Sequence, residues 1–268
     1  MREELKRQVE TCIDRCSGEL TELADTIWNN PEYNFKEYKA CRSITGLLEN
    51  HGFEVERGTG GIETAFHAFC DSGKPGPHIA FLAEYDAVPG MGHACGHNLM
   101  AAMSAGAGIA VKSVLPQLKG SISVFGTPAE EGGGGKVIML ENGAFNGVDA
   151  AMIIHSANET VVNDISYSRT DIIVDFFGKG AHAATWPEEG ISALDPLLLL
   201  FQHISQMRLR WNGQGTILGI ISEGGEDPIH IPEHCQGKFT VRSFSMKTKK
   251  KLLGDFLEAC EAAARMSG

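Results

Sequence analysis

The chain carries little positive charge. Its 268 residues include 23 Lys and Arg against 34 Asp and Glu, so the formal net charge is −11 at pH 7. A surface of this sign is repelled by nucleic-acid phosphates and by anionic lipid headgroups. We therefore expect no nucleic acid and no membrane as partner, and small molecules as the ligands.

Long apolar runs are also missing. The longest apolar stretch, around residues 197–201, is far shorter than the roughly 20 residues that cross a membrane. The first twenty residues are charged and amphipathic, whereas a signal peptide has a basic segment followed by an apolar one. These two absences predict a soluble chain without a signal peptide.

The cysteines lack the regular spacing of a disulfide scaffold. There are seven, an odd number, scattered along the whole chain: Cys12, Cys16, Cys41, Cys70, Cys95, Cys235 and Cys260. Free thiols in a reducing compartment are the simplest interpretation of this pattern. We expect a cytoplasmic protein.

Hydrophobic periodicity predicts an α/β fold in the first part of the chain. Apolar residues recur at helical spacing in four segments, and three short apolar runs between them have the length of buried strands. The helices are expected at 3–28, 35–49, 98–115 and 135–142, and the strands at 78–83, 121–125 and 150–154. Alternation of this kind is typical of a largely parallel sheet flanked by helices.

The pattern changes after about residue 168. A strand, a helix, two strands and a last helix follow within about a hundred residues, which predicts a separate, smaller α+β module. No low-complexity linker separates the two parts. We expect domains at 1–168 and 169–268.

Side chains that can bind metals follow each of the three predicted strands. The residues concerned are Glu84, Asp86, Cys95 and His97 after the first strand, Glu130 and Glu131 after the second, and His155 after the third. Ligands of open α/β sheets bind beyond the carboxyl ends of the strands. We therefore expect these side chains to converge in one crevice.

Their chemistry suits divalent metal ions. Cys95 and His97 stand two apart with Gly96 between them, and thiolate and imidazole are ligands that zinc prefers. Adjacent carboxylates at a buried strand end are costly unless a cation or proton lies there. Glu130 and Glu131 can divide the work: one binds metal, and the other moves the proton of an attacking water.

Other interpretations of the same residues exist. Cys95 and its neighbouring histidines could be buried and merely hydrogen-bonded, the two glutamates could lie on a solvated loop, and His155 could cap the sheet. Cys95 could also be a nucleophile with His97 or His93 as its base. Three coincidences at three strand ends favour the metal site.

Four segments carry a family resemblance. EYDAVPGMGHACGHN, TPAEEGGGGK, the strand-end His155 and GKGAHAATWPEEGISALDP together resemble the aminoacylase and carboxypeptidase G group of co-catalytic metallopeptidases. Within it, the N-acyl-amino-acid amidohydrolase branch is most similar, and there the aminobenzoyl-glutamate hydrolase and dipeptidase subgroup. The resemblance implies a zinc-peptidase-like catalytic domain with an inserted lid and dimerisation domain from about residue 169.

The resemblance also implies roles for single residues. Cys95 matches the cysteine that joins two metal ions, His97 and His155 match histidine ligands, and Glu131 matches the carboxylate ligand. Glu130 matches the general base and acid that activates a metal-bridging water. Two divalent ions are implied, and the thiolate favours zinc over manganese.

Three further residues are candidates outside the ligand set. His182 matches a histidine that reaches the active site of a partner subunit and stabilises the oxyanion, which implies a homodimer. Arg242 stands where related enzymes have an arginine for a substrate carboxylate, but an arginine on a surface strand is an equal alternative. Asp86 either contributes to the substrate site, orienting a ligand from behind, or is a turn residue.

The implied reaction is metal-dependent hydrolysis of an amide bond. Candidate substrates are N-acyl amino acids, small dipeptides and aminobenzoyl-glutamate-like amides. The chain departs from the family pattern at Asn98, where many relatives carry Asp, and at residues 224–232, which lack an expected asparagine.

A final histidine ligand of the family falls after the small domain, beyond residue 268. The alternative prediction is therefore a truncated or degenerate relative that binds or dimerises without turnover.

Overall fold

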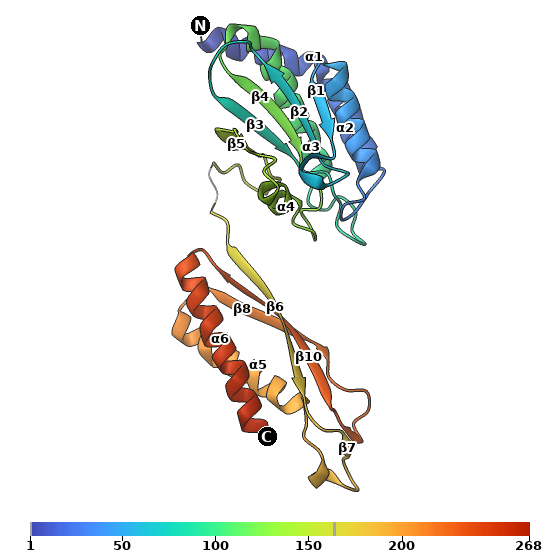
Figure 1. The fold of residues 1–268 in the computed structure, drawn as a ribbon, viewed down its shortest axis with the longest axis vertical. Coiled ribbons are helices and arrows are strands. Elements are labelled where there is room, and N and C mark those ends of the chain that lie inside the picture. The colour runs from blue at the N-terminus through green and yellow to red at the C-terminus, as the bar shows by residue number, and fades with distance from the viewer. Residues whose placement is uncertain (1, 163–164) are drawn as a thin grey trace. The chain divides into compact units, whose positions relative to one another are not determined.

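The computed structural model describes residues 2–162 and 165–268. The chain divides into two units, Met1–Thr160 and Val161–Gly268, each with its own core (Figure 1). The sequence places the boundary a few residues later, at 168, where the first strand of the second unit begins.

The first unit is built on a five-stranded sheet. Its order is β1 (Glu54–Arg57), β2 (Phe66–Asp71), β4 (Ser121–Gly126), β3 (His78–Ala83) and β5 (Ala150–Met152). The three strands that the sequence predicts, β3, β4 and β5, run parallel to one another. The α/β class is confirmed. The antiparallel strands β1 and β2 are not among the predicted elements.

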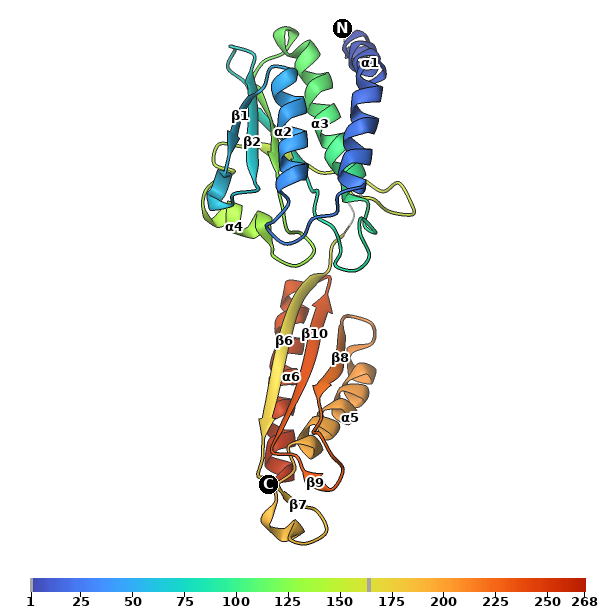
Figure 2. The same cartoon turned by 90° about the vertical axis from the view of Figure 1, so that its right-hand side faces the viewer.

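Three helices cover one face of this sheet: α1 (Arg2–Trp28), α2 (Tyr38–Asn50) and α3 (His97–Val114). Figure 2 shows them side by side in front of the strands. The short α4 (Gly135–Glu141) packs against the opposite face together with the 3-10 turn Thr59–Gly61.

Helix α3 packs unusually close to its neighbours. A Cβ added at Gly108 would lie 2.4 Å from the Val124 side chain in the sheet, and one at Gly106 would lie 2.8 Å from Leu20 in α1. A larger residue at either position would require its neighbour to shift. The small residues of α3 therefore place its first turn firmly at the end of the sheet.

By length and composition alone, one helix of the described chain could cross a membrane. The segment His97–Gln117, which is α3 with the 3-10 turn Leu115–Gln117, has a mean hydropathy of 1.4, and 61% of its apolar window is buried inside the unit. This burial is that of a helix in the core of a folded domain. The apolar character of α3 reflects its place between the sheet and α1.

A polar network crosses the opposite face of the sheet. The Nε2 atoms of His67 on β2 and His78 on β3 each lie 2.7 Å from the hydroxyl of Ser123 on β4. The His67 ring stacks on Phe125 with parallel planes 4.3 Å apart at their centroids. The buried hydroxyl is therefore fully hydrogen-bonded within the sheet.

The second unit follows the predicted order of strand, helix, two strands and helix. Antiparallel strands β6 (Ser168–Phe177), β10 (His234–Ser243) and β8 (Thr216–Glu223) form its sheet in that spatial order. Helices α5 (Leu194–Trp211) and α6 (Met246–Ser267) share the core on one face.

A two-stranded ribbon of β7 (Ala181–His182) and β9 (His230–Ile231) adjoins the 3-10 turn Pro187–Glu189 in the second unit.

Candidate metal centre

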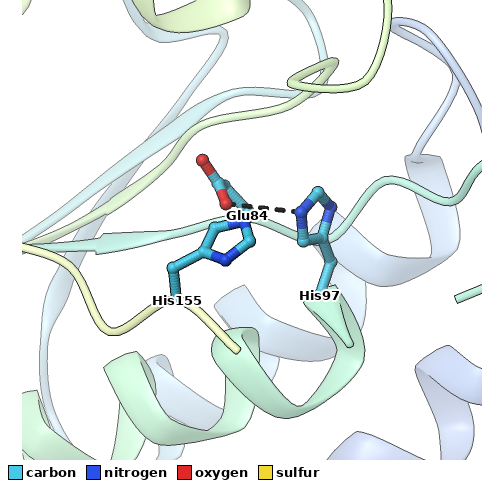
Figure 3. A group of neighbouring side chains, drawn as sticks. All are labelled: Glu84, His97 and His155. Atoms are coloured by element: carbon cyan, nitrogen blue, oxygen red, sulfur yellow. Dashed lines mark ion pairs between the residues drawn. The ribbon is translucent and has the colours of Figure 1, made fainter. Parts of the chain in front are cut away.

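The ends of the three parallel strands bring ligand-type side chains together. Glu84 directly follows β3, and His155 follows β5. Together with His97 they offer three ligand atoms that all lie within 4.8 Å of one another. Figure 3 shows the Glu84 carboxylate and the His97 ring pointing toward each other, with His155 beside them.

A second group shares His97. Glu130 and Glu131 follow β4. Each offers one carboxylate oxygen, and these two oxygens and a His97 ring nitrogen all lie within 4.8 Å of one another. The His97 Nε2 atom is 4.0 Å from a Glu130 oxygen and 3.9 Å from a Glu131 oxygen, and 3.4 Å from Glu84 Oε2. Three carboxylates therefore lie within 4.0 Å of a single His97 nitrogen.

The local backbone fixes His97 at this point. It is the first residue of α3, and Gly96 before it adopts a left-handed conformation with φ of +74°. A Cβ on Gly96 would lie 2.6 Å from the hydroxyl oxygen of Ser156, next to His155. Glycine is therefore required for the turn that brings Cys95 and His97 beside the third strand end.

Asp86 holds two of these groups from behind. Its Oδ1 and its carbonyl oxygen lie 3.1 and 2.9 Å from His97 Nδ1, and its Oδ2 accepts a 2.9 Å hydrogen bond from the Glu131 amide. Because Nδ1 donates to Asp86, the Nε2 lone pair of His97 faces the centre. The Asp86 side chain is buried and contacts two of the predicted ligands, and its implied role remains a prediction.

The centre is short of positive charge. Burial alone would lower the pKa of His97, but the hydrogen bond to Asp86 and the Glu84 carboxylate outweigh it and raise that pKa. Burial would raise the pKa of Asp86, and its hydrogen bonds from His97 and Glu131 lower it instead. A carboxylate-rich site of this kind holds a proton or a cation.

The residues present fit a divalent metal. Glu84 Oε2, His97 Nε2 and Glu131 Oε1 are buried, and each lacks a hydrogen-bond partner within the described part of the chain. Buried polar atoms are almost always paired, so three orphans within one small space need an explanation. Each is an atom through which carboxylates and imidazoles bind metal ions.

Cys95 stands next to this centre and is partly exposed. The hydrogen-bonded Glu131 carboxylate, with burial and further acidic neighbours, raises the pKa of its thiol to about 11. A nucleophilic cysteine needs the opposite shift, because only the thiolate attacks. The surroundings therefore disfavour the interpretation of Cys95 as a nucleophile.

Glu130 and Glu131 differ in exposure. The Glu131 side chain is 18% exposed and the Glu130 side chain 39%. Burial and the Glu84 carboxylate raise the pKa of Glu130, although Lys136 opposes them. A carboxylate that is partly open to solvent and has a raised pKa suits a group that takes up and releases protons.

His155 is the most exposed of the predicted ligands. Its Nδ1 lies 3.0 Å from the carbonyl oxygen of Ser156, so Nδ1 donates and Nε2 keeps its lone pair. Its ring meets that of His97 edge to face, with centroids 5.8 Å apart.

Two neighbouring polar residues serve packing. His93 Nε2 donates to the carbonyl oxygen of Ile27, and Asn98 Nδ2 donates to that of Ala24. Both contacts tie the segment around Cys95 to α1. The Asn98 departure from the family pattern thus lies in a packing contact between helices.

Sequence reasoning missed two functional candidates. It places Glu84 at a strand end without giving it a role, and it passes over Lys136. In the structure, Lys136 Nζ forms an ion pair with Glu84, whose side chain is only 3% exposed. The available signal was an acidic residue that directly ends a buried strand, where a charge requires a partner.

His182 and Arg242 lie in the second unit. His182 Nδ1 accepts hydrogen bonds from the Thr185 hydroxyl at 3.1 Å and the Ala184 amide at 3.3 Å. Arg242 stands on the central strand β10, and its Nε is buried without a hydrogen-bond partner among the described residues. The roles implied for both remain predictions.

Comparison with characterised proteins gives related enzymes. Xaa-Arg dipeptidase of Homo sapiens is 35% identical over 285 residues, which cover 98% of this chain and 64% of the relative. A p-aminobenzoyl-glutamate hydrolase chain of Escherichia coli K12 is 32% identical over 286 residues, covering 99% of this chain and 59% of the relative. The chain thus spans less than two thirds of these relatives.

Solved structures share the fold. A putative aminohydrolase of methicillin-resistant Staphylococcus aureus superposes with a TM-score of 0.83 at 22% identity, covering 98% of this chain and 73% of that chain. A dinuclear metal binding peptidase of Bacillus subtilis gives a TM-score of 0.71 at 23% identity, covering 94% and 72%.

The sequence profile described as Peptidase family M20/M25/M40 matches residues 80–264, which include the strand ends of the first unit and most of the second. The resemblance found in the four sequence segments is confirmed. The chain belongs to peptidase family M20/M25/M40.

Proposed function

We propose that this protein hydrolyses an amide bond with the help of divalent metal ions. The substrates are small: dipeptides, N-acyl amino acids or aminobenzoyl-glutamate-like amides. The names of the relatives, a dipeptidase and an aminobenzoyl-glutamate hydrolase, support this class. Because the chain spans only 64% and 59% of those relatives, the activity is a proposal for this chain.

One observation carries the proposal. Among the residues that the structure describes, three buried ligand atoms on Glu84, His97 and Glu131 lack hydrogen-bond partners. They lie at the ends of parallel strands, where sheets of this class bind their ligands. A hydrogen-bonded core would have satisfied them. The same place holds a carboxylate with a raised pKa, Glu130, that is open to solvent.

The chain's own residues divide the chemistry. Cys95, His97, Glu131 and His155 hold the metal, which when bound polarises the substrate carbonyl and acidifies water. Asp86 keeps the His97 Nε2 lone pair aimed at the centre. Glu130 takes the proton of the attacking water and delivers it to the leaving amine. His182 donates to the oxyanion in the active site of a partner subunit, as the family resemblance implies.

The ligand chemistry favours zinc over manganese. Thiolate and imidazole are ligands that zinc prefers, whereas a centre made only of carboxylates suits manganese. Cys95 and two histidines lie at this centre. A cytoplasmic location agrees with the ligand role, because a reducing compartment keeps Cys95 a free thiol.

A homodimer through the second unit is part of the proposal. Ile173, Phe177, Leu218 and Ile220 expose apolar side chains on the strands of its sheet. Apolar patches on a folded surface mark contact sites. Light scattering on the purified chain should give twice the chain mass, and a monomer at all concentrations would contradict the dimer.

Metal analysis and amidase assays on one sample test the function. The wild-type chain should carry divalent ions and hydrolyse members of a panel of dipeptides and N-acyl amino acids until a chelator is added. Glu130→Gln should keep the metal and lower kcat by about 10²–10⁴, and the exposed Glu141→Gln is the matched control. Fewer than one ion per chain with no chelator-sensitive activity would overturn the proposal.

The same experiment decides the alternative of an inactive relative. A chain that binds its ions and dimerises but hydrolyses nothing in the panel would be a binding protein. If activity then returns when the additional sequence of the longer relatives is supplied, incompleteness and not degeneration is the cause.

A further inference from the structure

The glycine run after the two adjacent glutamates folds into a tight loop. The amides of Gly133 and Gly134 donate to the Ala129 carbonyl oxygen at 3.0 and 2.8 Å. A Cβ on Gly135 would lie 2.0 Å from the Pro128 carbonyl oxygen, and one on Gly133 would lie 2.4 Å from the Phe35 ring. A side chain at either position would clash, so this loop conformation needs glycine there.

The loop delivers one particular side chain. Lys136 is the second residue of α4, directly after the loop, and its ammonium pairs with Glu84 Oε1. Glu84 directly follows β3, more than fifty residues earlier in the chain. The Lys136 side chain is 32% exposed and that of Glu84 is 3% exposed, so the pair reaches from the surface into the buried side of the centre.

The two oxygens of Glu84 have different surroundings. Oε1 is bound by Lys136, whereas Oε2 is buried, has no hydrogen-bond partner among the described residues and lies 3.4 Å from His97 Nε2. A buried carboxylate with one free oxygen is costly unless a cation meets that oxygen. The Glu84 carboxylate shares a group of close ligand atoms with His97 and His155, both with an Nε2 lone pair available for such a cation.

We propose that Glu84 is a metal ligand in its own right, through Oε2, and that Lys136 is the positioning residue that holds it in place. The inference rests on the proposed function and extends its ligand set of Cys95, His97, Glu131 and His155. Glu84 adds a carboxylate to the group of ligand atoms that it forms with His97 and His155.

Lys136 also fixes how Glu84 binds. Because the ammonium occupies Oε1, only Oε2 is available, and Glu84 can bind an ion through one oxygen only. Single-oxygen binding keeps the coordination number low, which suits the four-coordinate geometry of zinc. Without Lys136 the carboxylate is free to turn and offer both oxygens, as in sites that accept higher coordination numbers.

Metal titration of the full chain, stripped of metal, tests Glu84. Calorimetry with Zn²⁺ should show that Glu84→Gln lowers the affinity for one ion by at least about tenfold while the other ion binds as in the wild type. Glu84→Asp keeps the charge but moves the carboxylate oxygen away from the ion site, so it should also weaken the binding of that ion. Glu141→Gln should match the wild type.

The absorption spectrum of bound Co²⁺ tests Lys136, because four-coordinate Co²⁺ absorbs far more strongly than six-coordinate Co²⁺. Lys136→Met should weaken the band and lower the affinity by about tenfold, whereas Lys136→Arg should restore most of both. A purely structural lysine would leave the spectrum unchanged. The exposed Lys119→Met is the matched control.

The outcomes separate the two proposals. Wild-type Zn²⁺ and Co²⁺ binding that is unchanged in folded Glu84→Gln, Glu84→Asp and Lys136→Met overturns this inference and leaves the proposed function standing. A wild-type chain that binds no ion overturns both. Circular dichroism of each metal-free variant establishes that it is folded before the titration.

Discussion

The two units of this chain treat buried polar groups in opposite ways. The first unit buries glutamate, aspartate and histidine side chains, among them Glu37, Glu84, Asp86 and His97. In the second unit, among the residues that the structure describes, the buried polar side chain is Ser243, and its hydroxyl donates to the carbonyl of Gln214. The first unit thus buries whole ionisable side chains, whereas in the second unit Arg242 buries its Nε atom but stays partly exposed.

The reason lies in where each unit places its charges. In β10 and β6 of the second unit, apolar residues alternate toward the helices while charged residues face outward, as for Lys238 and Asp175. In the first unit the charges stand at strand ends, where the chain leaves the sheet and cannot alternate. The alternation of apolar and charged residues along the strands therefore stabilises the second unit. In the first unit, the charged residues of the candidate site break this pattern and reduce stability.

The largest expected effect tests whether the units are independent. Phe256 of α6 is fully buried in the core of the second unit, so Phe256→Ala should cost about 3–5 kcal/mol there. Hydrogen exchange of the full chain should show lost protection in the second unit and unchanged protection around β3 and β4. Equal loss in both units would contradict the comparison.

Substitution of a loop glycine should lower the stability of the first unit alone. Gly135→Ala forces a Cβ against the Pro128 carbonyl and should cost about 3 kcal/mol. Gly134→Ala has open space but a φ of +65°, so it should cost only about 1–2 kcal/mol. Denaturant unfolding measures the free energy of unfolding of both variants. Equal losses would show that the loop shifts to accommodate the new Cβ atom of Gly135→Ala.

Metal binding should sharpen the contrast further. If ions bind only the folded first unit, Zn²⁺ at about 100 times its Kd should stabilise that unit by about 2.7 kcal/mol. Hydrogen exchange with and without Zn²⁺ should show slower exchange near His97 and Glu131 and no change in β6, β8 and β10. Slower exchange spread evenly over both units would show that they unfold together.

The smallest effect concerns a surface histidine of the second unit. His234 lies 2.9 Å from Asp175 and 3.3 Å from Glu223, and the hydrogen bond to Asp175 raises its pKa. A raised pKa in the folded state means that the contribution to stability is complete below pH 6.5 and disappears as the pH rises through the folded-state pKa.

His234→Gln should therefore lose a small amount of stability at pH 5 to 6 relative to the wild type, and nothing at pH 9. Thermal unfolding across this pH range measures the difference. A deficit that stays constant with pH would mean that packing, and not the charge of His234, causes it.

Much of the fold was predictable because long, periodic segments specify it. The helices over 2–28 and 97–114 and the parallel strands after residues 77 and 120 follow from apolar spacing alone. Strands β1 and β2 escaped prediction. The sequence of β1 is four mostly charged residues, and in β2 apolar residues alternate with His67 on a face that carries the Ser123 network.

The candidate site was predictable as a set of residue types and not as a geometry. Strand ends of a parallel sheet share one edge, so the meeting of His97, Glu131 and His155 follows from topology. The contact of Lys136 with Glu84 depends on how a run of glycines folds, and glycine allows too many backbone conformations for the sequence to indicate one. The two hydrogen bonds of Asp86 depend on the same turn geometry.

The close packing of α3 has a consequence for the entropy of ligand binding. His97 begins a helix whose Gly106 and Gly108 pack closely against α1 and the sheet, so packing on two sides restrains the helix that carries this ligand. Glycine loses more conformational freedom on folding than any other residue. The glycine loop before Lys136 therefore loses its conformational entropy when the protein folds. Both sides of the centre are therefore ordered before binding, and an ion meets a preorganised receptor.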